Sequence, residues 1–201
     1  MTVSLVILDS DGVINYDSDD YIKSPDEWLP LPGSLEAIAR LCRADYTVIV
    51  ATNQAGVGRG IFSLDMLIRI HTKMASSIRD KGGRLDSVFF CPHSPTDQCA
   101  CRKPKPGMLL EISDRLGIGL SDVPFVGDSL TDLKAAAAAS AMPVLVQTGQ
   151  GRLTQEKLSQ GGLSQTVRQT PVYADLAEFT DAVLDGHLES AAGQTDQGPH
   201  R

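Results

Sequence analysis

Short apolar runs rich in β-branched residues alternate with helical patterns along most of this chain. The runs are Val3–Leu8, Tyr46–Thr52, Leu85–Cys91, Val123–Val126 and Pro143–Gln147. Between them, apolar side chains recur at helical spacing, as in the segment that follows Pro32-Gly33-Ser34. This alternation is typical of a parallel sheet flanked by helices, so the sequence predicts an α/β fold.

The helical segments and the domain boundary follow from the same pattern. Helices are predicted from Ser34, from a cap near Ser63, and over Met108–Leu116, Thr131–Ala139 and Ala174–Leu184. After Gly149 the periodicity weakens in a polar stretch with paired glycines. A chain of 201 residues fits one domain, predicted over residues 1–187, and residues 188–201 have so little to bury that we expect a disordered tail.

The charge balance limits the kinds of partner. A net charge of -7 argues against a nucleic-acid-binding surface and against a basic membrane-binding face. The first residues do not read as a signal peptide, and no apolar stretch approaches the roughly 20 residues of a membrane span. We therefore expect a cytoplasmic protein whose cysteines are reduced or metal-bound.

Carboxylates follow two of the predicted strands at the point where each ends. Asp9 and Asp11 come directly after the first strand, and Asp128 comes after the fourth. Each alone could be a helix cap. Ligands bind at the carboxyl ends of strands in such sheets, so together the three predict a shared site. An oxygen-only ligand set with room for water and a phosphate oxygen suits Mg²⁺.

Groups suited to phosphate lie near the same edge. Thr52 and Asn53 end the second strand and open the glycine-rich loop NQAGVGRG, whose exposed N–H groups can bind phosphate oxygens. Arg102 and Lys103 supply the local positive charge that an acidic protein needs in order to hold an anion.

Between the third strand and the next helix lies a group of soft and borderline metal ligands. Its members are Cys91, His93, Cys99 and Cys101. Three cysteines and one histidine match a closed tetrahedral zinc site, which would be structural; unrelated buried cysteines are the alternative. Because Cys101 immediately precedes Arg102, zinc would fix the loop that carries both cations.

Four ordered motifs resemble those of haloacid dehalogenase phosphatases: DSDG at Asp9–Gly12, Thr52-Asn53, Lys103, and GDSLTD at Gly127–Asp132. The resemblance implies a three-layer Rossmann-like parallel sheet. It also implies that Asp9 attacks phosphorus to form an aspartyl-phosphate and that Asp11 acts as acid and base.

The same resemblance implies the remaining catalytic roles. Thr52 and Lys103 would stabilise the charge on the phosphoryl group. Magnesium would be held by Asp9, by the main-chain carbonyl of Asp11, and by Asp128. Asp132 would orient the metal shell. No stretch between Ala55 and Lys103 is long enough for a separate cap domain, so we expect a capless enzyme with an open site.

The segment CPHSPTDQCACRKPKPGM, together with TNQAGVGRG, narrows the resemblance to the D-glycero-D-manno-heptose 1,7-bisphosphate 7-phosphatases, from Val3 to about Gly149. It implies a small phosphorylated sugar as substrate and a role in lipopolysaccharide core or surface-glycan synthesis. The residues predicted to contact substrate are Asp17, Asp20, Asn53, Arg102 and Ser129. Many members have arginine where this chain has Ser10, and some have lysine at the position of Ser129.

Two other functions stay open at this point. The related histidinol-phosphate phosphatases share the zinc loop, and a non-catalytic module could bind a sugar phosphate without cleaving it. Retention of Asp9, Asp11, Lys103 and Asp128 favours an enzyme, because a binding module has no need of all four. We expect a monomer.

Overall fold

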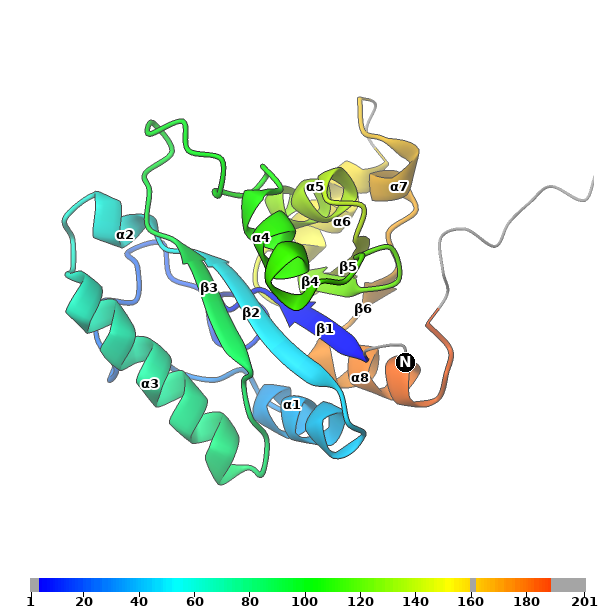
Figure 1. Ribbon diagram of the computed structural model, residues 1–201, viewed down its shortest axis with the longest axis horizontal. Helices are drawn as coiled ribbons and strands as arrows, with labels where there is room; N and C mark the ends of the chain where they lie inside the picture. Colours follow the sequence, from blue (N-terminus) through cyan, green and yellow to red (C-terminus); the bar gives the residue numbers. More distant parts are fainter. Residues whose placement is uncertain (1–3, 160–161, 189–201) are drawn as a thin grey trace, which may run out of the picture.

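The computed structural model, which describes residues 4–159 and 162–188, contains one parallel sheet of six strands. The strands lie in the order β3-β2-β1-β4-β5-β6, and every neighbouring pair runs parallel (Figure 1). Their bounds are β1 Leu5–Leu8, β2 Thr47–Asn53, β3 Ser87–Cys91, β4 Pro124–Gly127, β5 Met142–Val146 and β6 Val172–Tyr173. The predicted α/β fold is confirmed.

The order of the strands creates a switch point between β1 and β4. From β1 the chain builds outward to β2 and β3, then returns to place β4 on the other side of β1. The two strands are in register over their last residues, with Leu8 opposite Val126. The loops that follow them therefore leave the sheet side by side, which is where ligands bind in open α/β sheets.

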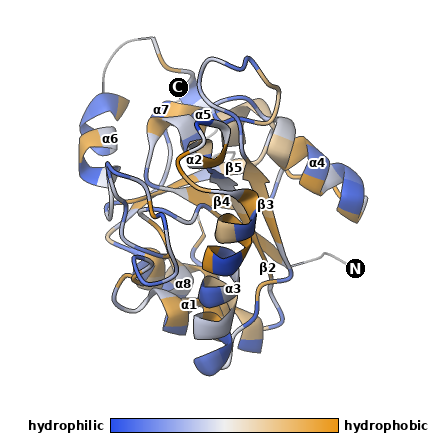
Figure 2. Cartoon of the chain, turned by 90° about the vertical axis from the view of Figure 1, so that its left-hand side faces the viewer, coloured by the Kyte–Doolittle hydropathy of each residue, from blue (hydrophilic) through white to orange (hydrophobic). Residues whose placement is uncertain are grey.

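Helices cover both faces of the sheet. Their bounds are α1 Ser34–Arg43, α2 Ala55–Gly58, α3 Leu64–Asp80, α4 Gly107–Leu116, α5 Leu130–Ala138, α6 Gly151–Leu158, α7 Gln165–Arg168 and α8 Leu176–Leu184. Side chains alternate across β1, so Val6 and Leu8 pack with α1, α3 and α8, whereas Leu5 and Ile7 pack with α4 and α5. Figure 2 shows the hydrophobic strands enclosed by helices with polar outer faces. The predicted three-layer arrangement is confirmed.

Side-chain caps explain where several helices begin. Ser63 accepts a hydrogen bond from the main chain of Met66, as predicted for α3. Ser129 and Asp132 form a capping box at the start of α5. Asp175 caps α8, which therefore begins at Leu176 rather than at Ala174.

The structure extends the prediction after Gly149. The segment forms α6, α7 and the two-residue strand β6, none of which was predicted. The buried side of α6 consists of Gly151, Thr154 and Leu158. The sequence of α6 therefore lacks the apolar stripe from which a helix is predicted. Leu188 packs against the core, whereas residues 189–201, most of the predicted tail, lie outside the described residues, as does Val3.

No helix in the described part of the chain combines the length and the apolar character needed to cross a membrane.

One half-buried histidine of α3, His71, faces the edge strand β3. The ring of His71 meets Phe90 edge to face, with centroids 5.8 Å apart. Its Nε2 has no hydrogen-bond partner among the described residues. Burial lowers the pKa of His71 to about 4, because the charged imidazolium would lose its hydration.

This environment predicts a specific loss of stability in acid. Between pH of about 6.5 and 4 the unfolded chain protonates His71 whereas the folded chain does not, so the free energy of unfolding falls as the pH falls. Relative to His71→Leu, the wild type should lose about 2 kcal/mol of stability between pH 7 and pH 4.5. Urea denaturation at several pH values measures this difference, and a constant difference would contradict it.

Candidate active site

Three buried carboxylates gather at the switch point of the sheet. Asp9 follows β1, Asp128 follows β4, and Asp132 lies in the first turn of α5. One oxygen from each lies within 4.8 Å of the others. The structure thus brings together Asp9 and Asp128, which lie far apart in the sequence.

Lys103 is the cation at the centre of this cluster. Its Nζ lies 2.8 Å from Asp9 Oδ1 and 2.7 Å from Asp132 Oδ1, and it donates to the carbonyl oxygen of Ala51 at 2.9 Å. The side chain is only 2% exposed. Burial alone would lower the pKa of Lys103, but the charges of Asp132 and Asp9 outweigh it and raise the pKa.

One lysine does not balance three carboxylates. Burial, reinforced by the neighbouring acids, raises the pKa of Asp9 well above its usual value despite the opposing charge of Lys103. Burial, together with the charge of Asp132, raises the pKa of Asp128 to about 7. The cluster therefore holds an excess of negative charge that a further cation would stabilise.

The hydrogen bonds show which oxygens are free to meet that cation. Asp9 Oδ1 also accepts from the main chain of Ser10 at 2.8 Å, and Asp128 Oδ2 accepts from the main chain of Gln150 at 2.7 Å. Asp132 is engaged at both oxygens, by Lys103 and by Ser129. Among the described residues, nothing bonds Asp9 Oδ2 or Asp128 Oδ1. Two free carboxylate oxygens and a net negative charge fit a hard divalent cation such as Mg²⁺.

Gly12 allows the loop after β1 to lie against Asp128. Its φ is +77°, and a Cβ atom there would lie 2.1 Å from Asp128 Oδ2. Thr148 Oγ1 donates to the carbonyl oxygen of Gly12 at 2.6 Å, so the loop after β5 holds the loop after β1 in place.

Asp11 lines the same pocket but stands apart from the carboxylate cluster. It accepts from Asn15 Nδ2 at 2.8 Å and from Gln54 Nε2 at 3.4 Å. Burial raises the pKa of Asp11, and the hydrogen bond from Asn15 opposes that rise. A raised pKa suits a carboxyl group that donates a proton near neutral pH.

Ser10 and Gln54 enter the site through contacts that sequence reasoning missed. Ser10 Oγ donates to Thr52 Oγ1 at 2.8 Å, and Gln54 Nε2 donates to the same atom at 3.2 Å. In the sequence, Ser10 stands out only as a departure from the arginine of many relatives, and Gln54 only as part of the glycine-rich loop. Both residues orient Thr52, whose hydroxyl group lies between the loops after β1 and β2.

The residues predicted to contact substrate are placed unequally. A pocket of about 500 Å³ is lined by Asp17, Asn53, Arg102 and Ser129 as well as by the acids. Asp19 lines this pocket and Asp20 does not, so the contact of Asp20 with substrate stays a prediction. Asn53 uses its amide on the main chain of Lys103, accepting at 3.1 Å and donating at 3.2 Å.

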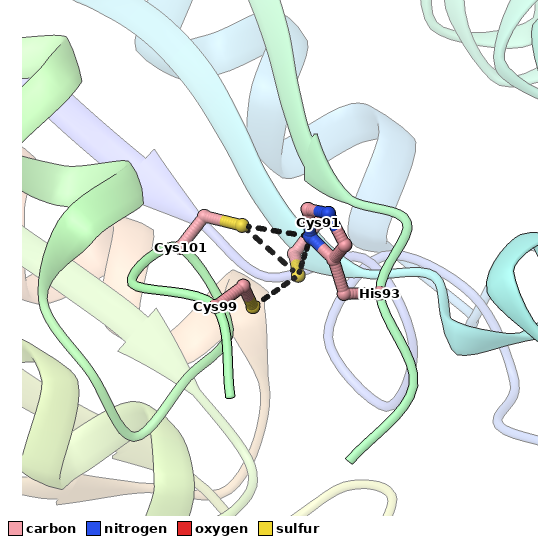
Figure 3. Close-up of side chains that lie close together, drawn as sticks. All are labelled: Cys91, His93, Cys99 and Cys101. Carbon is pink, nitrogen blue, oxygen red and sulfur yellow. Dashed lines mark hydrogen bonds between the residues drawn. The ribbon is translucent and has the colours of Figure 1, made fainter. Parts of the chain in front are cut away.

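The three cysteines and His93 form a second cluster beyond the end of β3 (Figure 3). Cys101 Sγ lies 3.2 Å from both His93 Nδ1 and Cys91 Sγ, and Cys91 Sγ lies 3.6 Å from both Cys99 Sγ and His93 Nδ1. These distances are close to the edges of about 3.6–3.8 Å expected for a tetrahedron with zinc–ligand bonds of 2.0–2.3 Å. Burial and the neighbouring thiols raise the pKa of Cys91 to about 12, so a thiolate here calls for a bound cation.

Comparison with known proteins identifies similar chains. Residues 100–179 match the HAD-hydrolase-like family. The D-glycero-beta-D-manno-heptose-1,7-bisphosphate 7-phosphatase of Bordetella bronchiseptica is 54% identical over 182 residues, which cover 90% of this chain and 98% of that protein. The protein of the same name from Pseudomonas aeruginosa is 50% identical over 185 residues, covering 92% and 99%.

Solved structures agree with this similarity. The D,D-heptose 1,7-bisphosphate phosphatase from B. bronchiseptica, crystallised with magnesium and phosphate, has a TM-score of 0.86 and 53% identity, covering 92% of this chain and 99% of that one. The enzyme of the same name from Burkholderia thailandensis has a TM-score of 0.69 and 46% identity, covering 90% and 98%.

The position of Lys103 predicts how the acidic cluster responds to losing its cation. Lys103→Met should lower the free energy of unfolding by about 3 kcal/mol or more, because buried carboxylates are left unpaired. Magnesium should restore part of this loss. Urea denaturation with chelator and then with MgCl₂ measures both effects. Lys134→Met, which removes an exposed lysine from α5, should change stability by less than about 0.5 kcal/mol. Equal effects of the two variants would contradict the prediction.

Proposed function

Because the chain belongs to the D-glycero-β-D-manno-heptose-1,7-bisphosphate 7-phosphatase family of HAD-like hydrolases, we propose that it removes the 7-phosphate from a heptose 1,7-bisphosphate. The observation that carries this proposal is the buried Asp9 carboxylate, which has one oxygen held by Lys103 and the other free at the pocket. A carboxylate fixed in this way beside a pocket of about 500 Å³ is suited to nucleophilic attack.

The proposed reaction has two steps. The carboxylate of Asp9 attacks phosphorus, the bond between phosphorus and the sugar oxygen breaks, and Asp11 gives its proton to the leaving alcohol. Asp11 then takes a proton from water, which attacks phosphorus and breaks the bond to Asp9, so that inorganic phosphate leaves and the Asp9 carboxylate is restored.

The other site residues stabilise charge in this scheme. Thr52 and Lys103 contact the phosphoryl oxygens, and Ser10 and Gln54 orient the Thr52 hydroxyl group. Asp9, Asp128 and the main-chain carbonyl of Asp11 would hold Mg²⁺, which supplies positive charge opposite the phosphoryl group. Asp132 keeps Lys103 in place and caps α5.

Zinc is proposed for the second cluster, with a structural role. Its four protein ligands leave no open position for a substrate. Cys101 is followed by Arg102 and then Lys103, so the cluster fixes the main chain from which both cations reach the pocket.

The setting of the reaction follows from these features. All four cysteines are free of disulfide bonds, as expected in the reducing cytoplasm, so we place the protein there. We propose a single domain over residues 1–187 that acts as a monomer, because one chain supplies every group that the mechanism uses. The product, a heptose 1-phosphate, is a precursor suited to nucleotide-activated heptose for lipopolysaccharide core synthesis.

A comparison of substrates tests the proposed activity. The wild type with Mg²⁺ should show kcat/KM for heptose 1,7-bisphosphate about 10²-fold or more above that for histidinol phosphate. Asp9→Asn should lower phosphate release by about 10³-fold or more, because the amide is a poor nucleophile. Phosphate release from each substrate is the measurement. A preference for histidinol phosphate, or full activity of Asp9→Asn, would contradict the assignment.

Loss of the zinc cluster should lower activity and leave magnesium binding intact. A Cys99→Ser/Cys101→Ser variant should contain no zinc and lose about tenfold or more in kcat/KM, because the loop that positions Arg102 and Lys103 loosens. Its Tm should still rise with added MgCl₂. Cys42→Ser, which removes the cysteine outside the cluster, should keep its zinc. Metal analysis and kinetics on the same samples provide the test, and full activity without zinc would contradict the structural role.

A further inference from the structure

We propose that Arg59, braced by Tyr21, forms with Arg102 the subsite that binds the second phosphate of the bisphosphate, the one that is not cleaved. This inference rests on the proposed function and adds a residue whose role neither the motifs nor the reaction assigns. Arg59 comes from the end of the glycine-rich loop and lines the same pocket as Asp9 and Arg102.

The guanidinium of Arg59 is held in place by one aromatic side chain. Its Nη1 donates to the hydroxyl oxygen of Tyr21 at 2.7 Å, and its Cζ lies 5.9 Å from the centroid of the Tyr21 ring. Tyr21 itself has a φ of +63°, a left-handed conformation that bulky residues rarely adopt. Among the described residues Arg59 makes one side-chain hydrogen bond, so most of the arginine's donors stay unused.

The charges in the pocket leave Arg59 and Arg102 available to an anion. Lys103 is already neutralised by Asp9 and Asp132 at the reactive end. Neither arginine has a carboxylate partner in the described part of the chain. An arginine without a partner offers a planar fork that matches the oxygens of a phosphate.

The main chain next to Arg59 and the guanidinium of Arg102 both contact one short stretch of the cysteine loop, residues 92–94. Gly58, just before Arg59, donates from its main chain to the carbonyl oxygen of Pro92 at 2.8 Å. A Cβ at Gly58 would lie 2.5 Å from that oxygen, so only glycine permits this approach. Arg102 Nη1 donates to the next carbonyl, that of His93, at 3.4 Å. In Figure 1, α2 accordingly lies beside the loop that leaves β3.

Lys157 on α6 is the other cation in the pocket without an ion pair in the described residues. It is exposed, and no hydrogen bond from residues 4–159 or 162–188 fixes its side chain. Arg59 is held by two contacts before any ligand arrives, so it loses less conformational entropy on binding. Asp17 and Asp19, which also line the pocket, would repel a phosphate and leave the two arginines as its site.

The test compares a substrate with two phosphates and one with a single phosphate. Wild type, Arg59→Met, Tyr21→Phe and Lys157→Met are assayed on heptose 1,7-bisphosphate and on a hexose 6-phosphate. Arg59→Met should lower kcat/KM for the bisphosphate by about 30- to 100-fold, the size expected for charged hydrogen bonds, with a loss below threefold for the monophosphate. Tyr21→Phe keeps the ring and should raise KM for the bisphosphate several-fold at unchanged kcat.

A further variant serves as the control for the removal of a positive charge. Arg79→Met removes an exposed arginine of α3 that does not line the pocket, and it should match the wild type on both substrates. Equal losses on both substrates in Arg59→Met would overturn the subsite, and so would a selective loss in Lys157→Met instead.

Failure of the proposed phosphatase reaction would give a different result from failure of the subsite. A wild type that cleaved the monophosphate but not the bisphosphate would overturn the reaction alone. The subsite would then be decided by inhibition: the bisphosphate should inhibit the wild type at least tenfold more strongly than Arg59→Met, and equal inhibition would overturn it.

Discussion

The buried ion pairs of Lys103 are the interaction on which the site depends. Its ammonium group contacts Asp9 and Asp132 and a carbonyl of β2, so it joins the ends of three elements that are distant in the sequence. The sheet makes this possible, because β1 and β4 are neighbours at the switch point. The excess negative charge that remains destabilises the folded state. The same charge favours the binding of a divalent cation.

The two candidate metal clusters are linked through the main chain. Cys101 ends one cluster, and two residues later Lys103 enters the other. Asn53 holds both the N–H and the carbonyl group of Lys103 from the end of β2. The lysine is thus fixed from two sides, by the cysteine loop that precedes it and by the strand beneath it. A loop without a core of its own can therefore position a cation that is almost fully buried.

The sequence predicted the features that depend on local pattern. Strand ends mark where Asp9 and Asp128 converge, and the spacing of the cysteines and His93 marks their cluster, because each signal lies within a few consecutive residues. Contacts between distant loops left no such signal. Ser10 and Gln54 both donate hydrogen bonds to Thr52, and Asn53 accepts one from the main chain of Lys103. Asp19 rather than Asp20 lines the pocket. All of these contacts arise from the packing of loops, which the periodicity of apolar residues does not describe. For the same reason α6 was missed, since its buried side is made of glycine, threonine and leucine.

The contact between Gly58 and the cysteine loop has a consequence for how such a protein can diversify. The acids of the site follow strands of the sheet or begin α5, whereas Gly58, next to Arg59, and the side chain of Arg102 both contact the turn at residues 92–94. Changes in that turn would alter both contacts at once and leave the carboxylates where they are. Descendants of this chain could thus acquire new substrates by remodelling one surface loop, while the sheet that carries the chemistry is inherited unchanged.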